Sequence, residues 1–516
     1  MDYRESPADT APDVRGTCLT VATAIVVTLA AYGATLGAWF HPIDDALHIA
    51  GVVDGVYPSP HLRPAHFAWN RALMWAFGLD AGAWHAASLA LHAVTAVLVG
   101  TIARRVGLSR SSSVVATAVF ASLYAPNEVV AWVAAACGLL SVFFVALCGC
   151  AWIGYLSARG SGVRSWIWYA VAVAALVAAT ASKEDSVLAG PLLFGIQVVR
   201  EGWRSSLTPR SLAAYVPFAV VGGLYLSLAF DPSLWADRPG VGGYAFTWGL
   251  VPRAAANLAV LPYPRRVPMD DAPGWMLWAG LALIVGVLAV GLRARSDEAR
   301  QSPRALALGL VLALFGLLPV LPGPWGAVAA SRYSYPSVVG VALMAAACFH
   351  WGVSGRSFVP RAAVFLMALG WVALHTWSVR STLAWRFVRP SVEFQNLVEQ
   401  TFETLEASPR AAVLFVAPPL WNPLDHERSA VAFGEPGRIH SERVELDVAD
   451  LHAELSEWSE RGSVVVWLDD GWTPVPLDHT ELHGAVLDAA RSAASDNEVH
   501  GSLGAVPATW MERRPR

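Results

Sequence analysis

Long apolar runs constrain the fold of this chain more than any other feature. The chain has 516 residues, of which 55% are hydrophobic and 15% are charged. A helix needs roughly 20 consecutive apolar residues to cross the hydrocarbon core of a bilayer. The sequence therefore predicts an all-α polytopic membrane protein with about eleven transmembrane helices. The expected helices lie near 18–40, 83–103, 113–125, 129–156, 166–181, 186–199, 212–230, 275–292, 304–321, 336–353 and 362–379.

The loops between these runs alternate in charge, which predicts their orientation. Arginines gather in every second short loop, for example around Arg104 and Arg159. The positive-inside rule places these loops in the cytoplasm, provided that residues 231–274 form one long outer loop without a span. We therefore expect the N-terminal tail, residues 1–17, in the cytoplasm. We expect the first helix to remain uncleaved, because no small-residue cleavage site follows a short apolar core.

Residues 390–516 differ in composition from the rest of the chain. They contain 22 acidic and nine basic side chains, a net charge of −13. Two strand-like runs, 413–418 and 463–470, alternate with helix-like stretches. This pattern predicts a small α/β domain outside the membrane, after a transmembrane domain at 18–389. The negative charge opposes binding to anionic lipid, so we expect a role in acceptor recognition or assembly.

Two adjacent carboxylates, Asp44 and Asp45, follow the first apolar run in the segment HPIDDALHIAG. Charged side chains are costly to keep near lipid. A solvated loop or a helix cap would explain them, because Asp is common in both. A catalytic carboxylate at the membrane surface is the alternative. Taken alone, the two residues favour the structural explanation.

Other charged residues lie in the remaining loops on the predicted outer side. Each has a structural alternative: Glu128 could cap a helix, Lys183 and Glu184 could form an ion pair of under ~1 kcal/mol, and Arg332 could anchor a helix at the interface. Their gathering on one face is instead typical of a site where an anionic lipid headgroup meets a hydroxyl acceptor. The candidates are Arg63, Glu128, Lys183 (the only lysine), Glu184, Arg265, Arg266, Arg332 and Tyr333.

The order of these segments resembles a known family. HPIDDALHIAG, YAPNEVVAWVAAACGLLS, SKEDSVLAGPLL and ASRYSYPSVVGVAL are together similar to the GT-C-fold glycosyltransferases. The nearest branch is the protein O-mannosyltransferase-like group, which includes the transmembrane and tetratricopeptide-repeat O-mannosyltransferases and their bacterial relatives. The resemblance covers about residues 18–380. This chain lacks the tetratricopeptide repeats, so the family's acceptor cannot be carried over.

The resemblance implies a membrane glycosyltransferase that uses a polyprenyl-phosphate sugar at the outer face of the bacterial plasma membrane. It implies that Asp44 is the catalytic carboxylate with Asp45 beside it, that Glu128 is the acidic residue of the second outer loop, and that Arg332 lies near the donor phosphate. The acceptor would be a protein or glycolipid hydroxyl, and no nucleic acid is expected. Relatives of the mannosyltransferase type generally need no metal, so no cofactor is predicted, although Asp44, Asp45 and Glu128 are residue types that bind divalent metals.

These residue types suit the chemistry. An acceptor hydroxyl is a weak nucleophile and needs a base within hydrogen-bond reach. The lipid phosphate is already a good leaving group, so it needs charge stabilisation, which arginine gives bidentately. We therefore expect a direct, inverting displacement. The alternative function is a non-catalytic lipid-linked-sugar transporter or cell-envelope assembly partner. A transporter should show internal repeats and a polar path at mid-membrane depth, and neither is evident in the sequence.

Overall fold

The structure is a computed structural model, and it divides into two units that are described separately. The first unit comprises Met1–Ala38 and Ser59–Arg389, and the second comprises Trp39–Pro58 and Pro390–Arg516. The residues that the structure describes are 14–41, 45–53, 55, 63–229, 250–264, 274–293, 301–318, 333–354, 358–392, 395, 396, 399, 412–416, 439–442, 464–468 and 471–475.

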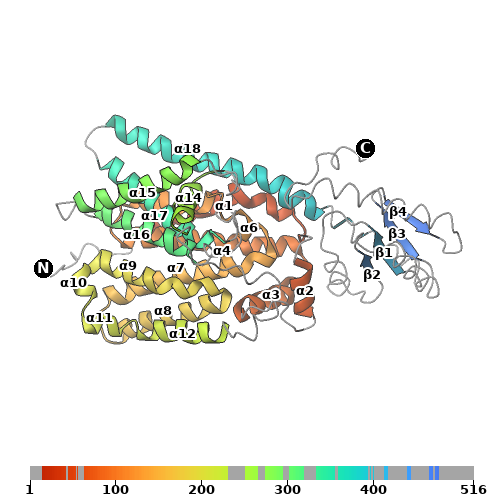
Figure 1. Cartoon of the computed structure of the whole chain (residues 1–516), viewed down its shortest axis with the longest axis horizontal. Coiled ribbons are helices and arrows are strands. Elements are labelled where there is room, and N and C mark those ends of the chain that lie inside the picture. The colour runs from red at the N-terminus through yellow and green to blue at the C-terminus, as the bar shows by residue number, and fades with distance from the viewer. Residues whose placement is uncertain are drawn as a thin grey trace. The chain divides into compact units, whose positions relative to one another are not determined.

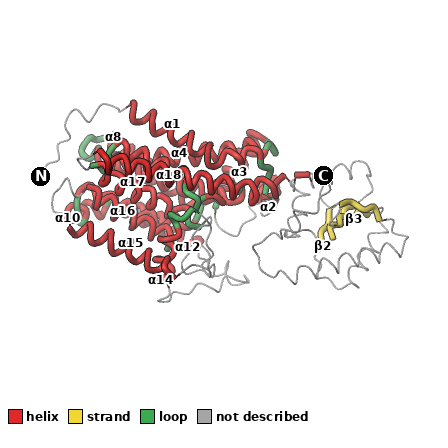
Figure 2. The backbone as a smooth tube through the Cα atoms, turned by 90° about the horizontal axis from the view of Figure 1, so that it is seen from above, coloured by secondary structure: helices red, strands yellow, loops and turns green. Residues whose placement is uncertain are grey.

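Helices build the described part of the first unit (Figures 1 and 2). Its α-helices are α1 (Val14–Tyr32), α3 (Pro64–Phe77), α4 (Ala81–Arg105), α5 (Arg110–Ser122), α6 (Asn127–Ala131), α7 (Ala136–Ser157), α8 (Val163–Ser182), α9 (Ala189–Glu201), α10 (Trp203–Ser206), α11 (Pro209–Ala213), α12 (Val216–Ala229), α14 (Leu250–Val260), α15 (Gly274–Arg293), α16 (Gln301–Leu317), α17 (Tyr335–Val353) and α18 (Phe358–Leu383). Short turns are the 3₁₀ helices η2 (Gly33–Gly37), η3 (Val133–Ala135) and η4 (Glu184–Leu188), and the π-helical turn η8 (Ala384–Val388).

Seven helical stretches among the described residues are long and apolar enough to cross a membrane. They are Val14–Gly37, Ala81–Arg105, Val133–Ser157, Val163–Ser182, Pro209–Leu228, Tyr335–Val353 and Phe358–Val392. Two apolar helices, Trp275–Val287 and Ser302–Leu317, are shorter. In the expected spans 113–125 and 186–199, the structure has α5 and α9, with 13 residues each. The all-α membrane architecture is thus confirmed for this unit, whereas the count of eleven spans stays a prediction.

The long loop expected over residues 231–274 contains a helix that is too short to span. This helix, α14, has 11 residues. It packs closely on α15. A Cβ atom added at Gly280 of α15 would overlap the backbone carbonyl of Ala255 in α14. A glycine at this point of α15 therefore allows the two helices to touch.

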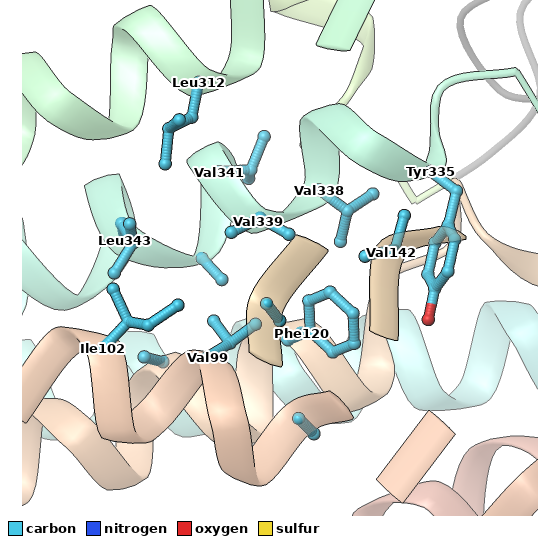
Figure 3. Packing of buried hydrophobic residues seen from close by; sticks show 14 of the residues in the cluster. Val99, Ile102, Phe120, Val142, Leu312, Tyr335, Val338, Val339, Val341 and Leu343 are labelled. Carbon is cyan, nitrogen blue, oxygen red and sulfur yellow. The ribbon is translucent and has the colours of Figure 1, made fainter. Parts of the chain in front are cut away.

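Apolar side chains from helices far apart in the sequence form one core cluster in the first unit. Figure 3 shows Ile102 of α4, Phe120 of α5, Val142 of α7 and Val339 of α17 in this cluster. In a membrane, lipid tails are as apolar as these side chains, so helix association depends on close packing. The interdigitation in this core is therefore what holds the unit together.

The contact between α16 and α17 is a second example of such packing. A Cβ atom at Gly309 would lie 2.7 Å from the carbonyl oxygen of Gly340, and one at Gly316 would lie 2.5 Å from the backbone nitrogen of Ser337. Gly309 and Gly316 are seven residues apart and share one face of α16. Small residues along this face let the two backbones approach each other.

Polar side chains join helix ends at the end of the first unit where α7 stops and α8 begins. Arg159 Nη1 donates to both carboxylate oxygens of Glu201, at 3.0 and 2.9 Å. Gln197 Nε2 donates to Glu201 at 2.7 Å, and Tyr215 Oη donates to Gln197 at 2.6 Å. This network joins the segment after α7 and the last turns of α9 to the residue before α12. We call this region the Arg159 end.

The second unit contains helix α2 (Asp45–Val53) and a four-stranded sheet. The strands are β1 (Ala412–Val416), β2 (Ile439–Glu442), β3 (Val464–Leu468) and β4 (Gly471–Val475), in the spatial order β2-β1-β3-β4. β1 pairs parallel with both β2 and β3, whereas β4 pairs antiparallel with β3.

The sequence predicted two of these four strands. The runs 413–418 and 463–470 overlap β1 and β3. Strand β4 was missed because Pro474 and the glycine at its start are unfavourable in a strand; its place at the edge of the sheet tolerates the proline. Most of residues 390–516 lie outside the described ones. The limits of this domain and its location outside the membrane therefore stay predictions.

Candidate active site

Charged side chains gather at the end of the first unit opposite the Arg159 end. Figure 1 shows α10 and α11 at one end of the helical unit and α3 at the other. Helix α3 begins just after Arg63, α8 ends just before Lys183, and Glu128 lies in α6. We call this region the Glu128 end.

The turn after α8 directs consecutive charged residues toward different partners. Helix α8 ends at Ser182, Lys183 is extended (φ −161°, ψ 142°), and η4 begins at Glu184. Arg63 donates two hydrogen bonds to the Glu184 carboxylate, from Nε to Oε2 at 2.9 Å and from Nη2 to Oε1 at 2.6 Å. This bidentate geometry is the strong form of an arginine–carboxylate pair. It joins residues that are 121 positions apart in the sequence.

Lys183 forms a second ion pair beside the first. Its Nζ lies 2.7 Å from Asp185 Oδ2, and both side chains are only 8% exposed. Ser141 of α7 donates to Asp185 Oδ1 at 3.2 Å. The ammonium also lies 5.5 Å from the ring centroid of Tyr333, within cation–π range. The structural alternative considered from the sequence, a Lys183–Glu184 pair, is therefore replaced by two other pairs. We call Arg63, Lys183, Glu184, Asp185 and Tyr333 the Lys183 cluster.

Electrostatics keep the Lys183 ammonium and the Glu184 carboxylate ionised. Burial lowers the pKa of the Lys183 ammonium, but the charge of Asp185 outweighs this effect and the net pKa is raised. Burial also raises the pKa of Glu184, but the charge and hydrogen bonds of Arg63 outweigh it and bring that pKa down to about 2. Each cation of the cluster thus has one carboxylate as its partner, and the cluster is close to neutral.

A separate segment, the turn between α5 and α6, leads into the helix that carries Glu128. Tyr32 of α1 donates from its hydroxyl to the carbonyl of Leu123 at 2.8 Å. Asn127 Nδ2 donates to the carbonyl of Tyr124 at 2.7 Å. Pro126 is the residue before α6, and Glu128 lies in the first turn of that helix. The turn is therefore fixed by hydrogen bonds within itself and to α1.

Glu128 pairs with an arginine that the sequence analysis did not single out. Arg386 Nη2 lies 2.6 Å from Glu128 Oε1, and the Glu128 side chain is 8% exposed. Arg386 belongs to the π-helical turn η8, which continues α18. Such turns are frequent at functional sites. The ion pair, rather than a helix cap, accounts for the orientation of the Glu128 side chain.

A small cavity of about 50 Å³ reaches the Lys183 cluster from the helix core. Asp185, Ser141 and Ser186 are polar residues of its lining. The rest of the lining is almost entirely apolar and comes from α4, α7, α9, α16 and α17. Ser141 and Ser186 hydroxyls lie 2.5 Å apart, so both are already hydrogen bonded. The cavity is too small for a sugar.

Of the two adjacent carboxylates, the structure describes only Asp45. Asp45 is fully buried and begins α2, and its Oδ2 accepts a hydrogen bond from the backbone N–H of His41 at 2.7 Å. Because His41 precedes α2, this contact holds the segment before the helix and is not a cap on the helix's own N–H groups.

Several predicted site residues lie outside the described residues. These are Asp44, Arg265, Arg266 and Arg332. The expectation that Asp44, Glu128 and Arg332 share one cavity therefore stays a prediction. Within the described ranges no three His, Cys, Asp or Glu side chains are grouped as a metal site.

Comparison with known proteins shows which solved structures have a similar fold. Neither a protein-family model nor a curated protein sequence matches the chain. Its structure is similar to the oligosaccharyltransferase AglB from Archaeoglobus fulgidus in complex with an inhibitory peptide and a dolichol-phosphate. The TM-score is 0.50 and the identity 11%, over 88% of this chain and 69% of that one. The apo form of the Archaeoglobus fulgidus oligosaccharyltransferase gives a TM-score of 0.51 at 11% identity, over 89% and 70% of the two chains.

ArnT from Cupriavidus metallidurans bound to undecaprenyl phosphate aligns with a TM-score of 0.47 and 13% identity, over 88% of this chain and 93% of that one. At identities this low, similarity shows the fold alone. The similarity to AglB confirms the expected GT-C fold. A specificity like that of the O-mannosyltransferases stays a prediction.

Proposed function

We propose that this chain is a membrane glycosyltransferase that moves a sugar from a polyprenyl-phosphate-linked donor to a hydroxyl acceptor. The observation that carries the proposal is the buried charge at the Glu128 end of a GT-C-fold helical unit. Ionisable groups are costly at such positions and are usually functional. The structure of AglB with a dolichol-phosphate and an inhibitory peptide supports a polyprenol-linked donor, and a protein acceptor in general terms.

Asp44 is the proposed base. Its carboxylate would take the proton of the acceptor hydroxyl while the oxygen forms a bond to the anomeric carbon. The bond from that carbon to the phosphate oxygen breaks in the same step, and the polyprenyl phosphate leaves with its electron pair. The sugar configuration is inverted. Asp45 would orient the segment that carries Asp44, because its carboxylate already accepts a hydrogen bond from the backbone N–H of His41.

Glu128 and Arg386 would act together beside the acceptor. The carboxylate of Glu128 keeps one oxygen, Oε1, on Arg386 at 2.6 Å. The carboxylate of Glu128 would accept a hydrogen bond from a sugar or acceptor hydroxyl. No metal is part of this proposal.

Arg63, Arg265, Arg266 and Arg332 are the proposed partners of the donor phosphate. Lys183, Glu184 and Tyr333 are proposed to line the edge of the donor site. Arginine suits this role because its planar fork matches phosphate oxygens. Lys183 and Arg63 are each paired with a carboxylate in the Lys183 cluster. A phosphate would therefore have to compete with Asp185 or Glu184 for them. This pairing favours a structural role for Lys183 over direct phosphate binding.

The membrane orientation and acceptor domain complete the proposal. The Glu128 end would face the outside of a bacterial plasma membrane, with the N-terminus in the cytoplasm. Residues 390–516, which carry a net charge of −13, would recognise the acceptor. The donor sugar is proposed to be a hexose of the mannose type, as the family resemblance suggests.

The test is donor turnover by purified protein in lipid nanodiscs. Undecaprenyl-phosphate mannose, glucose and galactose, each radiolabelled, are offered with and without a solubilised membrane extract as the acceptor source. We expect release of undecaprenyl phosphate with at least one donor, and loss of that release in Asp44→Asn. Glu201→Gln, at the Arg159 end, is the control that should remain active. Absence of turnover with all three donors in a well-folded protein would contradict the proposal.

A further inference from the structure

His375 of α18 stands where two loops at the Glu128 end meet. Its side chain is 1% exposed, and its ring nitrogens contact two backbone segments. The backbone N–H of Tyr124 donates to Nδ1 at 3.1 Å, and Nε2 lies 3.0 Å from the carbonyl oxygen of Pro262. Tyr124 is four residues before Glu128, and Pro262 is the second residue after α14.

The two contacts require one particular form of the imidazole ring. A backbone N–H is only a donor, so Nδ1 must accept and carries no proton. A carbonyl oxygen is only an acceptor, so Nε2 must carry the proton and donate it. Neutral His375 with its proton on Nε2 satisfies both partners. An alkyl side chain at this position would satisfy neither.

Two further contacts from the same helix hold the same two segments. Ser378, three residues after His375, donates to the carbonyl of Pro264. Arg386, eleven residues after His375, pairs with Glu128. Arg386 lies in the π-helical turn η8, which continues α18 without a break. The end of α18 and the η8 turn therefore hold the segment 124–128 at two points, the backbone of Tyr124 and the carboxylate of Glu128.

We propose that His375 is a positioning residue for Glu128, fixing the turn through Nδ1 and tying it to the segment after α14 through Nε2. The inference rests on the proposed function, because it assigns a residue that keeps Glu128 in its working place. His375 itself would touch neither donor nor acceptor. Its effect on the reaction would pass through the Tyr124 backbone alone.

Two substitutions separate the two hydrogen bonds. In His375→Asn, Oδ1 takes the place of Nδ1 and can accept from Tyr124, while the bond to Pro262 is lost. In His375→Gln, Nε2 takes the place of the ring Nε2 and can donate to Pro262, while the bond to Tyr124 is lost. Both variants lose the ring and one hydrogen bond, so each is the control for the other in overall stability.

The first measurement is amide hydrogen exchange of the full-length protein, read on peptides that cover residues 119–131. It needs no activity. We expect faster exchange in His375→Gln than in the wild type, and exchange close to wild type in His375→Asn. Equal exchange in the two variants, at matched thermal stability, would overturn the proposal.

The second measurement is donor turnover with the donor that the wild type uses. His375→Gln should lower kcat roughly 10- to 100-fold with little change in KM, because small displacements of a catalytic group have effects of this size. His375→Asn should stay within about threefold of the wild type by the same argument. If His375→Gln changes exchange and leaves kcat intact, the positioning role in the reaction is wrong. If the wild type turns over no donor, the proposed function fails, and the exchange result still decides whether His375 fixes the turn.

Discussion

The two ends of the helical unit hold their charged side chains in different ways. At the Arg159 end, the Arg159 and Glu201 side chains are 32% and 24% exposed. At the Glu128 end, the Lys183 and Asp185 side chains are 8% exposed each. Water-screened pairs contribute little to stability, whereas buried pairs carry a large desolvation cost. The first kind needs no explanation beyond holding helix ends together. The second kind marks the end of the unit where we expect function.

The largest expected effect is on the reaction itself. Asp44→Asn removes the proposed base while keeping the size of the side chain, so transfer should fall by roughly 10²- to 10⁴-fold. Asp45→Asn should lose less, because the amide oxygen can still accept the hydrogen bond from the His41 backbone N–H. The rate of donor turnover measures both, with Glu201→Gln from the Arg159 end as the control. Full activity in a well-expressed Asp44→Asn protein would contradict the assignment of the reaction to the Glu128 end.

The second prediction compares the stability of the two ion pairs. Lys183→Met leaves Asp185 buried without its cation and should destabilise the fold by about 3–5 kcal/mol. Arg159→Met breaks a partly exposed pair and should cost about 0–1 kcal/mol. Adding Asp185→Leu to Lys183→Met should restore much of the loss, because no buried charge remains. Unfolding in detergent, followed by tryptophan fluorescence, measures all three. Equal losses at the two ends would show that burial does not separate them.

A smaller effect is expected from the arginine of the π-helical turn. Arg386→Gln leaves Glu128 without a charge-assisted hydrogen bond, worth about 1.5–3 kcal/mol, and should lower kcat roughly tenfold. Arg386→Lys keeps the positive charge and should recover part of the lost kcat. The matched control is Arg380→Gln, on the exposed face of α18, which should leave kcat unchanged. If the Arg380 and Arg386 variants behave alike, the pair with Glu128 has no part in the reaction.

The smallest expected effect is on the acid dependence of stability. The folded pKa of Glu184 is about 2, below its ordinary value of 4.5. A lowered folded pKa contributes stability above pH 4.5, and this contribution is lost as the pH falls toward 2. The melting temperature should therefore fall over that window, and Glu184→Gln should flatten the fall. Solvent screening at this partly exposed carboxylate keeps the effect modest. An unchanged acid profile in the variant would contradict the role of Arg63.

The sequence could predict the helices because lipid imposes a simple rule of length and polarity. It ended the last helix near residue 379, since Arg380, Arg386 and Arg389 make the following stretch polar. In the structure α18 continues to Leu383 and passes into η8. Packing between η8 and η2 and the ion pair to Glu128 support this extension, and neither is visible in local hydropathy. Arg386 was missed for this reason.

Which charged side chains of the candidate site are partners could not be read from the sequence at all. The sequence did predict the residue types of the site and their common location, because Lys183, Glu184 and Glu128 follow or precede apolar runs on one predicted side of the bundle. The partnership of Arg63 with Glu184 spans 121 positions, and only the packing of α3 near α8 brings the two together. The sequence instead suggested the neighbour Lys183 for Glu184. Lys183 is extended at the end of α8, so the side chains of Lys183 and Glu184 point in different directions. The spacing of the residues in the sequence does not reveal this backbone conformation.

The single lysine of this chain gives it an unusual chemical property. Reagents that acylate amines attack the neutral form, and the Lys183 side chain is buried, charged and paired with Asp185. Apart from the N-terminal amine, such reagents have one target in 516 residues. Their rate at Lys183 is therefore set by how often the pair opens to solvent. Acylation kinetics, followed by mass spectrometry with and without donor, would record the opening of this end of the protein from a single natural side chain.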